Sequence, residues 1–171
     1  ADLTWMNRAH NGIQATKCVQ DAQNLGFDNI TIDLIYGLPE MTLEAWKINL
    51  QKALDLNVQH ISAYNLTVEP ETTLHHLVKT GKSKPLNDAA GAEQFEVLIN
   101  TLEKNKFKHY EISSFGKEGY FSKHNSSYWK RKFYLGIGPS AHSFNGNTRQ
   151  WNVANNAKYI KAIKVGEVPF E

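Results

Sequence analysis

The first half of the chain alternates between two kinds of hydrophobic spacing. Apolar residues three and four apart predict a helix over residues 13–25 and another over residues 43–54, the second preceded by the N-cap residue Thr42. Dense apolar runs at residues 30–35 and 60–66 predict buried strands. A strand, a helix and a further strand at this spacing indicate parallel strands joined by a right-handed crossover.

The second half of the chain departs from this regular alternation. We expect a short helix over residues 70–80, a long helix capped by Asp88, and a strand over residues 107–113. Glycine, serine, asparagine and aromatic residues dominate residues 115–151, which predicts loops and short strands that present side chains. A last helix is expected over residues 156–165. The whole pattern predicts an α/β fold followed by an α+β segment rich in loops.

Composition and charge give no support for nucleic-acid binding, a membrane-spanning helix or an internal disulfide. The 171 residues suffice for a domain with a real core, and the net charge of +2 gives no general argument for nucleic-acid binding. No apolar run approaches the length of a membrane-spanning helix. The single cysteine, Cys18, excludes an internal disulfide, which fits a reducing cytoplasm. Its place on a predicted helix favours a small buried apolar residue over a reactive thiol.

Two charged residues of the first half are candidates for ligand binding. Asp33 lies on the predicted strand, on the opposite face from Ile32, where an unpaired carboxylate is costly to bury. It could accept hydrogen bonds from ligand hydroxyl groups, or it could cap a neighbouring loop, and the pattern leaves both roles open. Arg8 could clamp a carboxylate with two parallel hydrogen bonds, or it could be a solvated surface residue.

Two segments of the second half carry further candidate chemistry. The string HNSSYW at residues 124–129 joins an imidazole, which is a good iron ligand, to aromatic rings that suit a flat macrocycle. The same string fits a loop whose aromatic residues pack into the core, with His124 hydrogen-bonded to the backbone. The string GIGPSAHS at residues 136–143 places His142 beside two serines, but the G-x-S-x-G elbow of a serine hydrolase is missing.

The order of these strings along the chain carries a family resemblance. The strings are NRAH at 7–10, IDLIYGLP at 32–39, HISAY at 60–64, Glu69-Pro70, Thr73-Leu74, HYEIS at 109–113, HNSSYW and GIGPSAHS. In this order, the chain resembles the oxygen-independent coproporphyrinogen III oxidase-like branch of the radical SAM superfamily. The HNxxYW string is more similar to the heme-chaperone subgroup of that family than to the oxidase itself.

The resemblance implies a fold and a set of binding residues. Residues 1–85 would form the C-terminal part of a partial (β/α)6 radical SAM barrel with parallel strands. Residues 86–171 would supply the last barrel-associated helix and strand and the family-specific HNxxYW and GxGxSAHS segments. In S-adenosylmethionine binding, Asp33 would contact the ribose and Arg8 the methionine carboxylate, with Thr67 and His142 lining the same pocket. His124 would bind heme. Independently of the resemblance, the basic run at 130–132 could be a solvated turn or could meet porphyrin propionates.

The resemblance also implies a [4Fe–4S] cluster that this chain does not hold. The family binds its cluster through a CxxxCxxC triad, which we expect before residue 1, and Cys18 alone cannot replace three thiolates. We therefore expect residues 1–171 alone to perform no radical chemistry. A barrel that lacks its first strands would expose a sheet edge and an apolar inner face, and two copies could pair to cover them.

Three functions are consistent with these sequence features. The first is a cytoplasmic heme chaperone that binds heme and passes it to an acceptor protein. The second is the true oxidase, which decarboxylates coproporphyrinogen III to protoporphyrinogen IX. The third is a scaffold that binds no ligand by itself.

Overall fold

The computed structural model describes residues 2–170, and the chain divides into two compact units. The first unit ends at Phe121 and the second begins at Ser122. The division expected after residue 85 concerns the barrel and the family-specific segments, and it stays a prediction. The long helix and the strands that follow residue 85 belong to the first unit and pack with its earlier elements.

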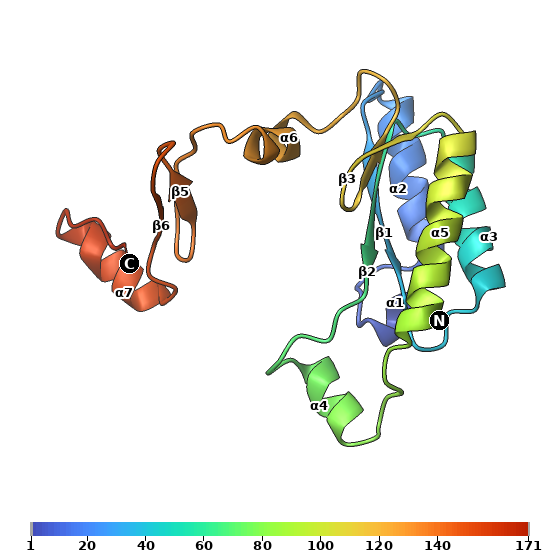
Figure 1. Ribbon diagram of the computed structural model, residues 1–171, viewed down its shortest axis with the longest axis horizontal. Coiled ribbons are helices and arrows are strands. Elements are labelled where there is room, and N and C mark those ends of the chain that lie inside the picture. Colours follow the sequence, from blue (N-terminus) through green and yellow to red (C-terminus); the bar gives the residue numbers. More distant parts are fainter. Residues whose placement is uncertain (1, 171) are drawn as a thin grey trace. The chain divides into compact units, whose positions relative to one another are not determined.

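The first unit is a four-stranded sheet with helices (Figure 1). Its elements in chain order are α1 (Asp2–Trp5), α2 (Gly12–Asn24), β1 (Thr31–Tyr36), α3 (Leu43–Asp55), β2 (His60–Asn65), α4 (Thr73–Lys79), α5 (Asp88–Lys104), β3 (Lys108–Glu111) and β4 (Ser114–Gly116). The strand order is β1-β2-β4-β3, with β1 and β2 parallel and the other pairs antiparallel. The predicted α/β fold is confirmed, while the partial barrel stays a prediction.

Two details of the expected elements differ in the structure. The strand predicted over residues 107–113 is confirmed as the shorter β3, and β4, which follows outside that range, pairs with it in an antiparallel hairpin with an irregular register after His109. The long helix α5 is capped by Asn87, whose side chain accepts a hydrogen bond from the backbone N–H of Ala90, so that Asp88 lies in the first turn.

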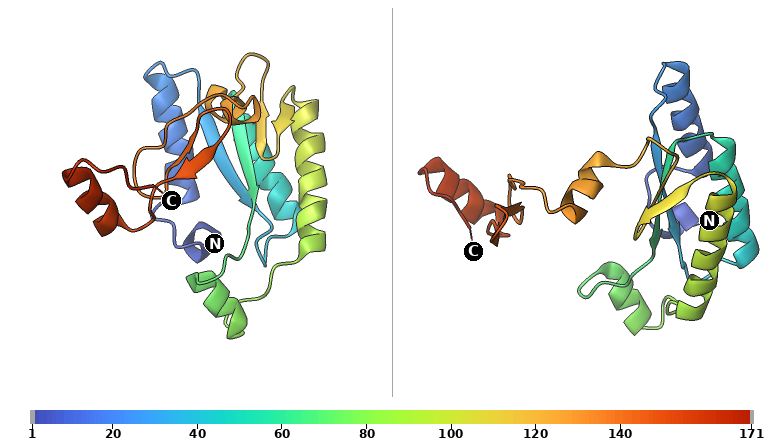
Figure 2. Two further views of the ribbon diagram at one scale, coloured as in Figure 1. Left: turned by 60° about the vertical axis from the view of Figure 1, so that its left-hand side comes forward. Right: turned by 45° about the horizontal axis from the view of Figure 1, so that its top comes forward.

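Helices α3 and α5 pack together on one face of the sheet (Figure 2). The apolar face of β2 and β4 meets them through Ile61 and Phe115, and Trp46, Leu50, Leu98 and Leu102 fill the space between, all of them fully buried. Each such side chain contributes about 1.5–3 kcal/mol of hydrophobic stabilisation. This core holds the carboxyl end of β1 and the loop after it in place.

Helix α2 differs from α3 and α5 because none of its residues is buried. Ile13, at its start, is 81% exposed, and Leu25, just beyond its end, is 79% exposed. Cys18 is a free, exposed cysteine, so the expected burial of its side chain was wrong. The apolar stripe predicted the helix correctly. Burial of the stripe requires a neighbouring element, and β1, the strand that follows α2, is at the edge of the sheet.

The second unit contains α6 (Lys123–Trp129), β5 (His142–Phe144), β6 (Arg149–Trp151) and α7 (Asn156–Lys164). Its buried centre is Asn152, whose side-chain amide donates hydrogen bonds to the carbonyl oxygens of Gly136 and Gly138. The HNSSYW string was expected in a loop, but it forms α6. Ser122 caps this helix by accepting a hydrogen bond from the N–H of Asn125. Among the residues that the structure describes, no helix is long and apolar enough to cross a membrane.

Candidate functional site

A cavity of about 630 Å³ lies at the outer strand of the first unit. Its walls come from α1, α2, β1 and α3. Ile32 and Asp33 both line it, although neighbouring residues of a strand point to opposite faces of the sheet. This is possible because β1 has a strand neighbour on one side only. The cavity therefore follows the outer edge of β1, where no other described strand covers it.

Arg8 and Asp33 both line this cavity, so the structure brings together two of the predicted site residues. The turn after α1 places Arg8, because Asn7 adopts a positive φ of 53° and the Arg8 N–H donates to the Leu3 carbonyl oxygen. Both side chains are exposed, and neither is in a salt bridge in the described part of the chain. An accessible guanidinium and an accessible carboxylate suit a ligand that carries a carboxylate and hydroxyl groups.

The other two residues predicted for S-adenosylmethionine do not line this cavity. Thr67 lies after β2, is exposed, and donates its hydroxyl hydrogen bond to a carboxylate oxygen of Glu69 at 3.0 Å. His142 is the first residue of β5 in the second unit, and its ring lies 5.7 Å from that of Trp151. Thr67 thus belongs to the first unit, outside the cavity, and His142 belongs to the second unit.

On the sheet face away from α3 and α5, a buried histidine joins three strands. The Nδ1 atom of His60 lies 2.7 Å from the Thr31 hydroxyl, and its Nε2 atom lies 2.8 Å from the Tyr110 hydroxyl. Burial lowers the pKa of His60, while the nearby carboxylates of Glu111 and Asp33 raise it. The lowering by burial prevails, so His60 is neutral at pH 7 and shares protons with two hydroxyl groups.

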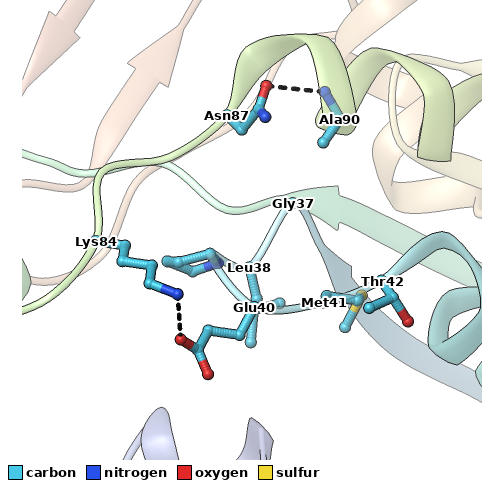
Figure 3. Close-up of a pocket in the computed structure, with 9 residues that line it drawn as sticks. Gly37, Leu38, Glu40, Met41, Thr42, Lys84, Asn87 and Ala90 are labelled. Atoms are coloured by element: carbon cyan, nitrogen blue, oxygen red, sulfur yellow. Dashed lines mark hydrogen bonds and ion pairs between the residues drawn. The ribbon is translucent and has the colours of Figure 1, made fainter.

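The loop after β1 borders a second cavity of about 480 Å³ (Figure 3). Glu40 and Lys84 form a salt bridge of 2.8 Å at this cavity. The buried side chain of Gln94 fixes the loop from behind. Its Oε1 atom accepts from the Gly37 N–H at 2.8 Å, and its Nε2 atom donates to the Met41 carbonyl oxygen at 2.9 Å.

In the second unit, α6 begins a row of aromatic rings. The His124 and Tyr128 rings are 5.1 Å apart and perpendicular, Tyr128 lies 4.8 Å from Tyr134, and Tyr134 lies 6.1 Å from Phe144. His124 and Tyr128 are four residues apart, which places them on one face of the helix. His124 is exposed, and neither of its ring nitrogens makes a hydrogen bond to any residue that the structure describes. Its imidazole is therefore available to a metal centre.

Residues 2–170 contain no group of three or more His, Cys, Asp or Glu side chains that could hold a metal ion. The isolated, exposed thiol of Cys18 does not fit an iron–sulfur cluster, which requires several thiolates.

The sequence interpretation gave no role to His60 or Gln94. His60 opens the HISAY string, and an imidazole at the start of an apolar strand is a signal that could have singled it out. Gln94 carries no such signal, because its position on α5 differs from the exposed positions only through contacts with a loop more than fifty residues away.

Comparisons with known proteins identify relatives by sequence and by fold. No family model matches the chain. It is 35% identical over 168 residues to the heme chaperone HemW of Bacillus subtilis, a match that covers 98% of this chain and 44% of that protein. It is 36% identical over 160 residues to HemW of Lactococcus lactis, covering 94% of this chain and 42% of that protein. A third relative is the mouse mitochondrial radical S-adenosyl methionine domain-containing protein 1, 35% identical over 142 residues.

The fold is similar to that of coproporphyrinogen III oxidase (HemN) from Escherichia coli, a radical SAM enzyme. The TM-score is 0.76 at 19% identity, and the match covers 98% of this chain and 41% of that structure. The chain thus spans less than half the length of the relatives it matches. Sequence and fold together confirm the resemblance to the oxygen-independent coproporphyrinogen III oxidase-like radical SAM family, with the HemW heme chaperones as the more similar group by sequence.

Proposed function

We propose that the full-length protein is a heme chaperone, which binds heme through His124 and transfers it to an acceptor protein. One observation supports this above the others: the HNSSYW string forms an exposed helix on which the His124 imidazole is accessible. The similarity to HemW proteins, which covers this string, points the same way.

The residues around His124 fit heme as a ligand. A neutral imidazole donates a nitrogen lone pair to iron, which is how histidine holds heme iron in many proteins. The ring of the neighbouring Tyr128 lies 5.1 Å from that of His124 and is 46% exposed, so flat apolar surface lies beside the imidazole. An exposed site of this kind also suits transfer, because a second protein can approach the bound heme.

The proposal is tested by a Soret-band titration of the full-length protein with heme, in the wild type and in the His124→Ala variant. We expect the variant to lose most of the heme binding. The matched control is His76→Ala, which removes an exposed histidine from helix α4. A His124→Ala variant that titrates like the wild type would contradict the assignment.

We also propose that Arg8 and Asp33 contact S-adenosylmethionine in the full-length protein, while Thr67 and His142 stay predictions of the sequence. The support is the cavity at β1, which presents a guanidinium and a carboxylate to a ligand that has a carboxylate and ribose hydroxyls. When bound, a [4Fe–4S] cluster would supply the electron for radical chemistry, and Cys18 alone would not hold it.

Calorimetric titration with S-adenosylmethionine tests this second assignment. Asp33→Asn should weaken binding by removing the charged acceptor for the ribose hydroxyls. The control Asp28→Asn makes the same change at an exposed position outside the cavity. Equal affinities for both variants would remove Asp33 from the site.

The alternative function is coproporphyrinogen III oxidation, and the likeness to the HemN fold is the observation that favours it. A shared fold is weak support for a shared reaction. The sequence matches favour the chaperone instead. An anaerobic assay of the full-length protein for protoporphyrinogen IX separates the two, since a chaperone forms none.

Two further parts of the proposal concern location and assembly. A lone free cysteine fits a reducing compartment, so we place the protein in the cytoplasm.

Pairing of two copies of residues 1–171 across the outer edge of β1 also stays a prediction. Light scattering of these residues checks it, and a monodisperse monomer would refute it.

A further inference from the structure

Charge is distributed very unevenly between the two units. Residues 122–171 contain eight Lys and Arg residues against two Asp and Glu, which gives a net charge of +6. Residues 1–121 contain eleven against fifteen, a net charge of −4. The overall value of +2 therefore conceals a strongly basic second unit. Such a surface attracts anionic ligands, and this attraction weakens as salt is added.

Three of these cations follow one another directly after α6. Lys130 is the C-cap residue of the helix, and Arg131 has a positive φ of 52°. The N–H of Arg131 donates to the Tyr128 carbonyl oxygen, and the N–H of Lys132 donates to that of Ser127. The backbone of this turn is therefore tied to the last turn of the helix, and the three side chains start from defined positions.

The three cations are not equivalent. The Arg131 guanidinium lies over the Phe144 ring, 6.0 Å from its centroid, so it helps to hold the turn against β5. Lys130 and Lys132 are exposed, and neither forms a salt bridge with any residue in the described range. These two ammonium groups are the ones available to a ligand.

The distance from His124 to the two lysines is comparable to the size of a metal-bearing macrocycle with carboxylate side chains. Lys130 follows His124 by six positions, which corresponds to about 9 Å along a helix axis. Two large apolar side chains flank the basic turn, Trp129 at 61% and Phe133 at 76% exposure. An imidazole near the start of α6, exposed apolar side chains beside the basic turn and two free cations in that turn match a flat, metal-containing dicarboxylate.

We propose that Lys130 and Lys132 form the carboxylate-binding end of the His124 site, where they contact the two propionates of the tetrapyrrole. This rests on the proposed function, since it assigns the orientation of the ligand that His124 binds. The carboxylate edge of the ring lies at the C-terminal end of α6, and the opposite edge of the ring points away from the basic turn.

A purely structural role for the two lysines makes a different prediction. Cations near the C-terminus of a helix stabilise it through the helix dipole. If that were their only role, their removal would weaken α6 and would affect every ligand of His124 alike, whether or not the ligand carries carboxylates.

The test compares two ligands and two variants of the full-length protein. The ligands are heme and heme dimethyl ester, in which both propionates are neutral, and binding is measured by Soret titration at low salt. The first variant is Lys130→Gln with Lys132→Gln, which leaves Arg131 on Phe144. The matched control is Lys158→Gln with Lys161→Gln on α7, which removes the same charge from the same unit.

We expect the first variant to bind heme about 5- to 10-fold more weakly than the wild type, which is the scale of two solvent-exposed charge pairs. Its affinity for the ester should equal that of the wild type, and the control should bind both ligands as the wild type does. Equal weakening for heme and ester would assign the lysines to helix stability. Equal weakening in the control would assign the effect to net charge. Either result overturns the proposal.

Failure of the proposed function gives a separate result. If His124→Ala binds heme as tightly as the wild type, His124 is not the ligand, whatever the lysine variants show. If His124→Ala abolishes binding but the lysine variant binds heme and ester like the wild type, the chaperone assignment stands and the proposed orientation of the propionates is wrong.

Discussion

The loop after β1 depends on one buried amide, and the Gln94→Met variant measures its contribution. Gln94 is only 2% exposed, and its side chain satisfies the Gly37 N–H and the Met41 carbonyl oxygen. Methionine has nearly the same length and volume as glutamine, so the variant removes the two hydrogen bonds without opening a large cavity. The backbone carbonyl of Gln94 still accepts from the Trp46 indole N–H, because the substitution changes the side chain only.

The expected cost follows from the two groups that lose their partner. Both are in buried surroundings, where an unsatisfied backbone donor or acceptor costs about 1–3 kcal/mol. The methionine recovers a small part of this by burying apolar surface. We therefore expect the free energy of unfolding of the first unit to fall by about 2–5 kcal/mol.

Hydrogen exchange resolved by residue or short peptide is the appropriate assay, because the chain has two units and a single unfolding curve would average them. The Gly37 amide should exchange much faster in Gln94→Met, and the amides of α5 should lose protection through the global destabilisation. The control is Gln20→Met on α2, where the glutamine is exposed. Urea unfolding of the same proteins supplies the total free energy.

The reasoning would be refuted by a Gln94→Met variant as stable as the wild type with unchanged exchange at Gly37. That result would mean that the loop finds other partners, or that its backbone groups are solvated. A loss confined to Gly37, with unchanged global stability, would show that the loop opens independently of the core formed by α3 and α5.

Two further predictions concern buried groups of the first unit. Burial holds the pKa of His60 below its ordinary value of 6.5, so the unfolded chain takes up the proton first as the pH falls. The stability contributed by neutral His60 should be fully present above pH 6.5 and should decline as the pH falls below it. Urea midpoints measured at several pH values should show a weaker dependence on pH in His60→Gln and a stronger one in Glu111→Gln, which removes a charge that raises the pKa of His60. Gly37→Ala should destabilise the unit by about 1–2 kcal/mol because of its positive φ of 76°. The added Cβ would lie 2.1 Å from the Asn65 side-chain oxygen, so the exposed Asn65 side chain must also rotate away. Urea unfolding measures the loss, and a Gly37→Ala variant as stable as the wild type would contradict this account.

The elements that sequence predicted well are those whose signal is local. The alternation of β1 and the apolar stripe of α3 are each contained in about a dozen residues, and the Thr42 cap is adjacent to its helix. Strand β4 has only three residues and is defined by its hydrogen-bonded pairing with β2 and β3, so no local sequence pattern predicts it. Helix α6 is rich in Asn and Ser, which have low helix propensity, and its Ser122 cap compensates for them.

The candidate site could be predicted in part for the same reason. The pattern alone left the roles of Arg8 and Asp33 open and the family resemblance selected them, and the structure places both at one cavity. Burial was harder to predict, because it depends on surfaces that are distant in sequence. Cys18 lies on a correctly predicted helix and is nevertheless exposed, whereas Gln94 resembles a surface residue in sequence and is nevertheless buried.

The histidines show why geometry separates candidates that residue type does not. His60 has both ring nitrogens engaged, by Thr31 and Tyr110, so it could bind a metal only after breaking a buried network. His109 has one ring nitrogen within 3.2 Å of the Ile112 carbonyl oxygen and stacks on Phe115. His124 has no such engagement in the described range, and its one ring contact, with Tyr128, leaves the nitrogens accessible. Among these three, His124 is the one with both ring nitrogens unengaged in the described range. This geometry supports the role that the motif suggests for His124 on α6.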